Sequence, residues 1–589
     1  MASTKASPSL IRFAILGLFL VLSTSPHAAI ADDLSLRDGI YVSRFSGLSS
    51  AVSSQETKGR TIVVDSPVTT CNLTIPADRS ITVSGNGIIA VGDGCTLTIL
   101  GPFSCGQRQA FTGKGVVKFS KGNVPEIYPQ WWGAVADGRS DCYHALRNMY
   151  NSFNLTGGGK IVFPKGRYWI AEYKKSGDSN INDLIIRNLD GVELVGYGAV
   201  IDINGSFRRT ADRTAGKRAY RYSNSNAITP FRLINCKNVT LRGFEIDGNT
   251  DLMTRDDGVA ESFAHGISIE GGRGILISDI NVHHCQSDGV YVSGFKVNEN
   301  LSTACRNLKI ENVKSSHNAR QGLSLIQARD VVVADSVFSY SGVTGGEYGG
   351  HAPMAGLDIE PNLSLSSTPR ADVVTGNIIF DKCRFEHNAG SQVTAAYADR
   401  TEKVSFKNCS IDATGSPSRY SMILAVADGL IEDSRIETGS GNFNIGWSSP
   451  YMNVQKTVVR RCKITGSKNV IQCATEGAVL IEGCNIRNTA AVLERNTYVP
   501  YLMDKNCIFR NNRIFVPKPG ATGQRKYQIA NRLNVAESSN NIFETDLSNT
   551  DYHLASGYGK YTRVINDGYS GSFRPFPNAK WEAHRPYSK

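Results

Sequence analysis

One short pattern of apolar and variable positions recurs along the chain from about residue 240 to 515. It runs: an apolar residue, two variable residues, a small or apolar residue, one variable residue, and a second apolar residue. Each instance predicts a strand, a tight bend and a second strand. Such a unit cannot bury its apolar face alone, so the repetition predicts a stack of units, a solenoid. The instances are Leu241-Phe244-Ile246, Ile277-Ile280-Val282, Val333-Ser336-Phe338, Phe380-Cys383-Phe385, Phe406-Cys409-Ile411, Ile431-Ser434-Ile436, Val459-Cys462-Ile464, Ile481-Cys484-Ile486 and Phe509-Asn512-Ile514.

The type of solenoid follows from the bends. The units are rich in strand-forming residues, show no helical period, and carry Asn or Gly at the bends, where a left-handed backbone is needed. These features favour a parallel β-helix, in which backbone groups pair from one rung to the next. The middle slot of the pattern holds Cys four times and also accepts Ser, Asn and Ile, which predicts an inward stack of small side chains.

The segment before the repeat predicts short strands and one helix. Strands are expected at 61–64, 81–84, 97–100 and 116–119, and a helix at 143–150. The intervening string Trp131-Trp132 is expected to seal the end of the solenoid, in preference to stacking on sugar.

Two strings carry a family resemblance. The stretch containing Trp132-Gly-Ala, Asp137-Gly and Asp141, followed by Ile161-Val-Phe-Pro, resembles the entry segment and first rungs of the pectate-lyase-like superfamily. That superfamily includes polygalacturonase-related proteins and phage tail-spike-like proteins. The resemblance implies a right-handed coil, a short helix that caps its open end, and action on a polysaccharide. It is also compatible with a homotrimer.

The predicted fold class is therefore all-β: a single-stranded right-handed parallel β-helix with a short N-terminal capping helix and a small N-terminal β region. The predicted organisation is a signal peptide at 1–31, an N-terminal β-rich region at 32–127, the β-helix at 128–515, and a C-terminal cap or tail at 516–589.

The first 31 residues have the pattern of a signal peptide. Lys5 and Arg12 precede a short apolar run, and Ala29-Ile30-Ala31 provides a small-residue cleavage site. The mature chain is expected to be secreted, periplasmic or at the cell surface, with no membrane span after cleavage. Export permits disulfides, and one bridge among Cys71, Cys95 and Cys105 is compatible with their spacing.

Charge narrows the choice of partner. The net charge is +11, which suits either an anionic polysaccharide or solubility alone. The basic residues are scattered and not interleaved with aromatic residues, so a nucleic-acid partner is not expected.

Four rungs share a second string, in which a glycine precedes an apolar residue and then a residue that should face outward. Aligning the glycines places acidic and polar side chains on one outer face, because rungs stack about 4.8 Å apart. The strings are Ala264-His265-Gly266-Ile267-Ser268, Ser287-Asp288-Gly289-Val290-Tyr291, Arg320-Gln321-Gly322-Leu323-Ser324 and Met354-Ala355-Gly356-Leu357-Asp358-Ile359-Glu360.

Paired carboxylates on this face indicate glycoside hydrolysis. Asp358 and Glu360 should project the same way with Cα atoms about 6.5–7 Å apart, and Asp288 supplies a third carboxylate. One acid and one base at roughly 6.5–9.5 Å suit an inverting hydrolase. The predicted catalytic residues are thus Asp358, Glu360 and Asp288. The predicted substrate-binding residues are Arg320, His265, Tyr291 and Gln321.

Other chemistries and a purely structural role remain open at this stage. In a β-eliminating lyase, Arg320 or a lysine would be the base and the carboxylates would hold Ca²⁺ against a uronate. A surface adhesin would bind glycan without turnover, and a charged ladder would only stabilise the solenoid. A C5-epimerase is a further alternative, although no strong string supports it. No zinc spacing is present, and no cofactor is otherwise expected.

Overall fold

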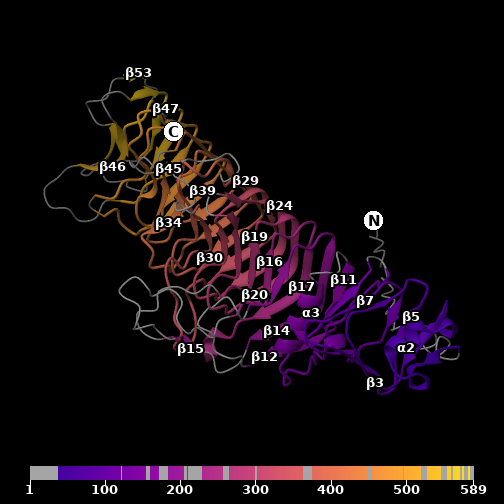
Figure 1. Ribbon diagram of the computed structural model, residues 1–589. Helices are drawn as coiled ribbons and strands as arrows, with labels where there is room; N and C mark the ends of the chain where they lie inside the picture. The colour runs from indigo at the N-terminus through magenta and orange to yellow at the C-terminus, as the bar shows by residue number, and fades with distance from the viewer. Residues whose placement is uncertain are drawn as a thin grey trace, which may run out of the picture.

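The computed structural model is one long coil whose rungs follow one another along a single axis from the N-terminal to the C-terminal end (Figure 1). The predicted signal peptide lies outside the residues that the structure describes, and export stays a prediction. The described residues are 38–120, 123–153, 159–171, 183–203, 208–209, 228–255, 264–298, 301–361, 375–446, 454–494, 496–518, 527–545, 553–558, 562–570, 573–575 and 581–583.

The N-terminal region is itself a small three-sided coil. Each turn of the chain gives one strand to each of three parallel sheets, and the four predicted strands are confirmed. The sheets are β1 Ile40–Tyr41, β2 Thr61–Val64, β5 Ser80–Val83 and β8 Phe103–Ser104; β3 Pro67–Thr70, β6 Ile88–Val91 and β9 Phe111–Gly113; and β4 Leu73–Ile75, β7 Thr96–Ile99 and β10 Val116–Phe119. A disulfide joins Cys71 to Cys95 in this region.

The predicted capping helix is α3, Tyr143–Phe153, which packs against β10 of the N-terminal region and against β13, Ile185–Arg187, of the main coil. At its start the Asp141 carboxylate accepts the Tyr143 N–H at 3.0 Å, which satisfies one of the N–H groups that the first turn leaves without an intrahelical partner. Trp131 and Trp132 lie on the 3₁₀ helix η3, Pro129–Trp132, and are 3% and 7% exposed. Their rings pack with other aromatic rings of the N-terminal coil, so they seal the end as predicted. The other short helices are α2 Leu48–Ser53, η1 Val42–Arg44, η2 Gln55–Thr57 and η4 Thr250–Leu252.

The main coil consists of two long parallel sheets within the described residues. The 14-stranded sheet, which carries the predicted site, contains β13 Ile185–Arg187, β16 Phe231–Ile234, β19 Ile267–Glu270, β21 Val290–Ser293, β25 Leu323–Leu325, β28 Leu357–Ile359, β31 Val393–Ala395, β34 Tyr420–Leu424, β37 Asn442–Ile445, β40 Val470–Cys473, β43 Tyr501–Leu502, β46 Tyr527–Leu533, β49 His553–Tyr558 and β52 Phe573–Pro575.

The 25-stranded sheet is bent lengthwise, so that most rungs give it two consecutive strands. Its strands are β11 Gly159–Val162, β12 Gly166–Ile170, β14 Val192–Ile203, β17 Thr240–Asp247, β20 Arg273–His283, β24 Cys305–Ser316, β26 Ala328–Ala334, β27 Val337–Ser339, β29 Gly376–Asp381, β30 Arg384–Glu386, β32 Val404–Lys407, β33 Ser410–Asp412, β35 Asp428–Glu432, β36 Arg435–Glu437, β38 Lys456–Arg460, β39 Lys463–Gly466, β41 Ala478–Glu482, β42 Asn485–Asn488, β44 Ile508–Arg510, β45 Arg513–Phe515, β47 Glu537–Ser539, β48 Ile542–Glu544, β50 Arg563–Ile565, β51 Gly568–Tyr569 and β53 Trp581–Ala583.

The bend in this sheet comes from single residues in the left-handed region. Lys382, Asn408 and Asp433 each have φ between 51° and 54°, and each separates the two strands of one rung. The next residue, in the middle slot of the repeat, then points inward. Cys383 and Cys409 in this slot are buried free thiols, as are Cys462 and Cys484, which confirms the predicted inward stack.

The predicted boundary at residue 515 is wrong. Strands β46 to β53 extend both sheets of the main coil to Ala583, so the last segment continues the solenoid. The apolar pattern weakens there, with Ser538 in a slot that earlier rungs fill with Phe, Ile or Val, and the sequence pattern did not predict these rungs for that reason. Among the helices of the described ranges, none is long and apolar enough to cross a bilayer.

The aromatic part of the core allows a test of the inward-facing assignment. Phe406 is 0% exposed, and its ring centroid is 4.8 Å from that of Phe380. The Phe406→Ala substitution is expected to lower the free energy of unfolding by about 3–5 kcal/mol, because it leaves a cavity. The measurement is chemical denaturation. The matched control is Ser405→Ala, on the outward side of the same strand, with an expected effect within about 0.5 kcal/mol. Equal effects of the two substitutions would contradict the inward placement of Phe406.

Candidate functional site

The predicted column of outward positions is confirmed by the strand register. Ser268 pairs with Tyr291, Tyr291 with Ser324, and Ser324 with Asp358, from β19 through β21 and β25 to β28. The alternate positions of the same strands fill the core. Residues separated by up to 90 positions in the sequence therefore form one straight row on the outer face of the 14-stranded sheet.

The residues before the aligned glycines form a second row beside the first. The Gly266 N–H donates to the Asp288 carbonyl at 3.0 Å, and the Gly289 N–H donates to the Gln321 carbonyl at 2.9 Å. Glycine is required at this turn because a Cβ on Gly289 would lie 2.0 Å from the Ser315 Oγ. The stacked turns thus hold the side chains of His265, Asp288 and Gln321 next to one another.

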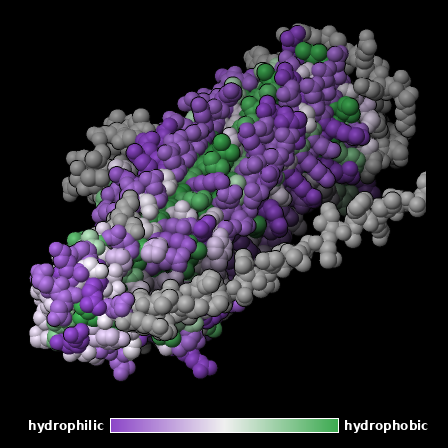
Figure 2. Space-filling view, turned by 90° about the vertical axis from the view of Figure 1, so that its right-hand side faces the viewer, coloured by the Kyte–Doolittle hydropathy of each residue, from purple (hydrophilic) through white to green (hydrophobic). Residues whose placement is uncertain are grey.

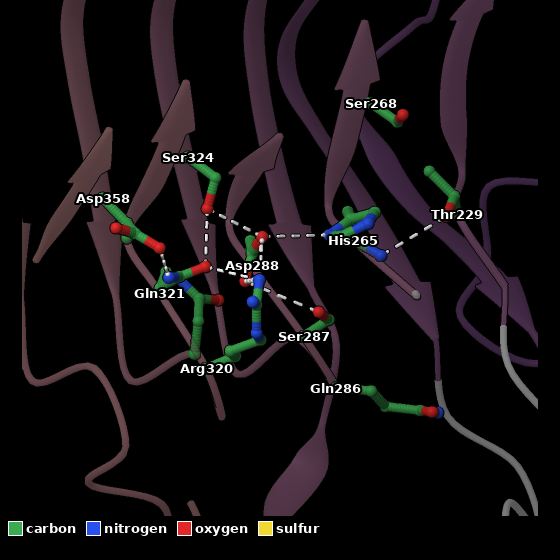
Figure 3. Close-up of polar contacts among 12 residues, drawn as sticks. Thr229, His265, Ser268, Gln286, Ser287, Asp288, Arg320, Gln321, Ser324 and Asp358 are labelled. Atoms are coloured by element: carbon green, nitrogen blue, oxygen red, sulfur yellow. Dashed lines mark hydrogen bonds and ion pairs between the residues drawn. The ribbon is translucent and has the colours of Figure 1, made fainter. Parts of the chain in front are cut away.

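Asp288 lies at the centre of the polar network (Figure 3). Its carboxylate is 3.2 Å from the Arg320 Nη1, and its Oδ2 lies 2.9 Å from the Ser324 hydroxyl oxygen. The His265 Nδ1 lies 3.5 Å away on the other side. Three neighbouring rungs therefore converge on this single carboxylate.

Gln321 connects Asp288 to Asp358. The Gln321 Nε2 donates to the Asp358 carboxyl, while its Oε1 accepts from the Arg320 Nη1 and the Ser324 hydroxyl, both at 2.6 Å. The amide thus has partners on both ends, and its orientation is fixed. A carboxyl at position 358 is held in one place by a chain of bonds that runs back to Asp288.

The expectation that this face is open to solvent is wrong for most of its residues. Asp288 and Gln321 are 0% exposed, Asp358 is 1% exposed and His265 is 4% exposed, whereas Glu360 is exposed. The physical reason is the close spacing of the rungs, which lets the turn side chains fold over the row and satisfy one another. The Arg320 Nη1 expected to bind a uronate is instead engaged by Asp288 and Gln321.

Burial determines the protonation of these groups. Burial and then the nearby Glu360 carboxylate raise the pKa of Asp358 to about 7. Burial likewise raises the pKa of Asp288, although Arg320 opposes the shift. Burial and then Arg320 lower the pKa of His265 to about 3, so its contact with Asp288 involves a neutral imidazole. Asp358 is thus poised to hold or release a proton near neutral pH.

Two tyrosines border the network. The Tyr291 ring stacks on the His265 ring with centroids 4.3 Å apart and an interplanar angle of 9°. The Tyr397 hydroxyl donates to the Glu360 carboxylate at 3.3 Å. Tyr397 was not among the predicted residues, because it follows β31 on a rung that lacks the glycine string. Its partner Glu360 is exposed, unlike the other two predicted carboxylates.

A groove that was not predicted from the sequence lies on the 25-stranded sheet. It encloses about 350 Å³, with Ile379, Leu430 and Val458 on its floor and Lys403, Lys456 and Arg460 at its sides. The floor residues belong to one outward row, in which each pairs with a neighbour on the next rung. Figure 2 shows one side of the molecule, where apolar patches follow one another along the long axis between hydrophilic borders. The sequence did contain a signal for this groove, because the outward positions that alternate with the core residues are apolar on these strands.

Possible metal ligands lie at a neighbouring corner of the coil. Asp247, His283 and His284 each offer one ligand atom, and these atoms lie within 4.8 Å of one another. Asp288 and Asp358 are not part of this group. No metal ligands were predicted from the sequence, so this cluster was not anticipated either.

Comparison with known proteins supports the class of fold. The family model described as a right-handed beta helix region matches residues 172–363, which include all seven predicted site residues. The chain is thus a right-handed parallel β-helix protein, the class to which the sequence resemblance pointed. No curated protein matches the chain significantly.

Several solved structures are similar to the chain, and three of them illustrate the range. One is the A-module of the Azotobacter vinelandii mannuronan C-5 epimerase AlgE6, with 13% identity, 79% of this chain and 100% of that chain covered, and a TM-score of 0.39. Another is the catalytic unit of a GH87 alpha-1,3-glucanase from Streptomyces thermodiastaticus, with 12% identity, 78% and 69% covered, and a TM-score of 0.41. A third is PfbA, a surface adhesin of Streptococcus pneumoniae, with 13% identity, 78% and 93% covered, and a TM-score of 0.37.

The raised pKa of Asp358 predicts a pH-dependent stability. The folded state binds the Asp358 proton more tightly than the unfolded state, so stability falls as pH rises from about 4 to about 7 and then levels. In the Asp358→Asn variant the Asn oxygen still accepts a hydrogen bond from Gln321. Because Asn does not ionise, the fall in stability between about pH 4 and pH 7 should be absent from this variant. The difference in unfolding free energy between variant and wild type should shift in favour of the variant by a few kcal/mol, at about 1.4 kcal/mol per pKa unit. Denaturation curves of both proteins across this range measure it. Parallel pH profiles would contradict the buried, protonated carboxyl.

Proposed function

We propose that this β-helix cleaves a polysaccharide by glycoside hydrolysis, with Asp358 as the general acid and Glu360 as its partner carboxylate. One observation carries the proposal: Asp358, a buried carboxyl with a pKa near 7, lies two positions before the exposed carboxylate of Glu360 at the end of β28. Two carboxyl groups whose surroundings push their protonation apart are the usual basis of acid–base division.

The division of roles follows from exposure. Asp358 holds its proton near neutral pH and would donate it to the glycosidic oxygen as the bond to the leaving sugar breaks. Glu360 faces solvent, and its carboxylate would take a proton from the water that attacks the sugar. The bond between Tyr397 and Glu360 would fix the direction of that carboxylate.

The remaining predicted residues would position the acid. Gln321 holds the Asp358 carboxyl, and Asp288 with Arg320 holds Gln321 and Ser324. Asp288 was predicted as a third catalytic carboxylate, but an anion with 0% exposure that is paired with Arg320 suits a positioning role better. His265 and Tyr291 would support the far end of the same network.

The test is a panel of neutral and anionic polysaccharides incubated with the mature protein. On a hydrolysed polysaccharide, Asp358→Asn and Glu360→Gln should each lower the rate at least about 100-fold, the usual contribution of acid–base catalysis. Reducing ends are measured, and Glu311→Gln on the 25-stranded sheet serves as the control. Unsaturated products that depend on Ca²⁺ would instead indicate the lyase chemistry. Unchanged rates in both variants would refute the assignment of Asp358 and Glu360.

A second candidate function is anionic glycan binding without turnover, and the groove on the 25-stranded sheet favours it. Its lysines are available to a ligand: within the described ranges, no carboxylate lies within 4 Å of the Lys403 or Lys456 ammonium. The apolar floor can contact the C–H faces of sugars, while the ammonium groups attract carboxylates or sulfates. The net charge of +11 acts in the same direction.

Charge removal in the groove distinguishes binding there from binding at the acid pair. The double substitution Lys403→Ala/Lys456→Ala should weaken binding of an anionic polysaccharide about 10-fold at low salt, with a smaller effect at high salt. Lys463→Ala, an exposed lysine on the neighbouring strand β39, should leave binding unchanged. Affinity is measured by calorimetry at two salt concentrations. An equal loss in both proteins would assign the effect to net charge alone.

A further inference from the structure

We infer that Asp247, His283 and His284 form a binding site for a divalent transition metal ion such as Zn²⁺. The His283 and His284 Nδ1 atoms face each other at 2.8 Å, and the Asp247 Oδ1 lies 3.5 Å from the His283 Nδ1. Ligand atoms that lie about 2.0–2.1 Å from one Zn²⁺ ion are about 3.0–3.4 Å apart at common angles. The two separations lie just below and just above this range, and one ligand atom from each of the three residues lies within 4.8 Å of the others, so a small adjustment would bring them onto one ion.

The opposite ring atoms provide the second part of the geometry. The His283 Nε2 lies 3.5 Å from a Glu245 carboxylate oxygen, and the His284 Nε2 lies 3.4 Å from an Asp251 carboxylate oxygen. A metal-binding imidazole ordinarily donates its other N–H to a carboxylate, which fixes the tautomer and the ring orientation. Here each ring has such a carboxylate near its Nε2 atom, opposite the Nδ1 atom.

The backbone explains why adjacent histidines can share one ligand. Neighbouring side chains on a strand point to opposite faces. His283 ends β20, and His284 has φ of 53°, in the left-handed region, which turns its ring toward that of His283. The His284 ring stacks on the His317 ring at 5.1 Å and 13°, so its direction is held by the next rung.

The site is accessible and connects several segments. The side chains of His283, His284 and Asp247 are 15%, 27% and 18% exposed, enough for an ion to enter while most of its shell is protein. Three protein ligands leave a fourth position for water or for a group of a ligand. Asp251 also accepts the Gly345 N–H at 2.8 Å, so the second shell ties a glycine-rich loop to this corner.

Nitrogen and carboxylate donors select the class of metal. Imidazole suits Zn²⁺, Cu²⁺, Ni²⁺ and Fe²⁺, whereas Ca²⁺ and Mg²⁺ prefer sites made of oxygen alone. The site is independent of the proposed hydrolysis at Asp358. Failure of one proposal therefore leaves the other standing.

The test uses the mature chain without a histidine tag, with Zn²⁺ and Co²⁺ as probes. Wild-type protein should bind one equivalent of Zn²⁺ by calorimetry, and Co²⁺ should give visible absorption bands that Zn²⁺ abolishes. His284→Ala and Asp247→Asn should each reduce the affinity at least 10-fold. Glu245→Gln, which alters only the second shell, should reduce it about 10–100-fold.

A histidine from a later rung, which packs against Tyr340 and not against His284, serves as the matched control. His387→Ala should bind Zn²⁺ as the wild type does, and circular dichroism checks that every variant is folded. Absence of stoichiometric binding by the wild-type protein would overturn the site. Equal affinity in the folded Asp247→Asn and His284→Ala variants would also overturn it.

Discussion

The hydrogen-bonded register between successive rungs is the constraint on which the rest of the structure depends. Parallel pairing places Ser324 beside Asp358 and Tyr291 beside Ser324, so side chains far apart in the sequence are set at the spacing of neighbouring strands. The same register stacks the aligned glycine turns and brings Asp288 next to Gln321. A slip of one residue on any rung would move each of these side chains into the core.

The buried polar network costs hydration free energy, and in return it fixes the position of the Asp358 carboxyl. Asp288 and Arg320 lose hydration, and a buried ion pair of this kind contributes little net stability. Removing either partner would leave a charge buried without compensation. What the network provides is position: Gln321 and Ser324 have partners on each side, and the Asp358 carboxyl is held at one point beside Glu360. An acid maintained in its protonated form requires such a rigid and dry setting.

The core could be predicted from the sequence because it obeys a period. The apolar, small and apolar pattern of Phe380, Cys383 and Phe385 recurs on rung after rung. It recurs because an inward position admits only small or apolar side chains. The outward row was also predicted in register, but its exposure was not. Whether Asp358 is open depends on how Gln321 and Arg320 fold over it, and that depends on side-chain geometry between rungs. The pairing of His283 with His284 was invisible for a similar reason, because it needs a left-handed residue at a strand end.

The most direct measurement is a crystal structure of the Asp358→Asn variant with a short oligosaccharide from whichever polysaccharide the protein binds. If Asp358 and Glu360 perform the chemistry, a sugar ring will lie against Glu360 and Tyr397, with a glycosidic oxygen within hydrogen-bond distance of the residue at position 358. An oligosaccharide seated only in the groove between Lys403 and Lys456, with Glu360 in contact with solvent alone, would contradict this assignment.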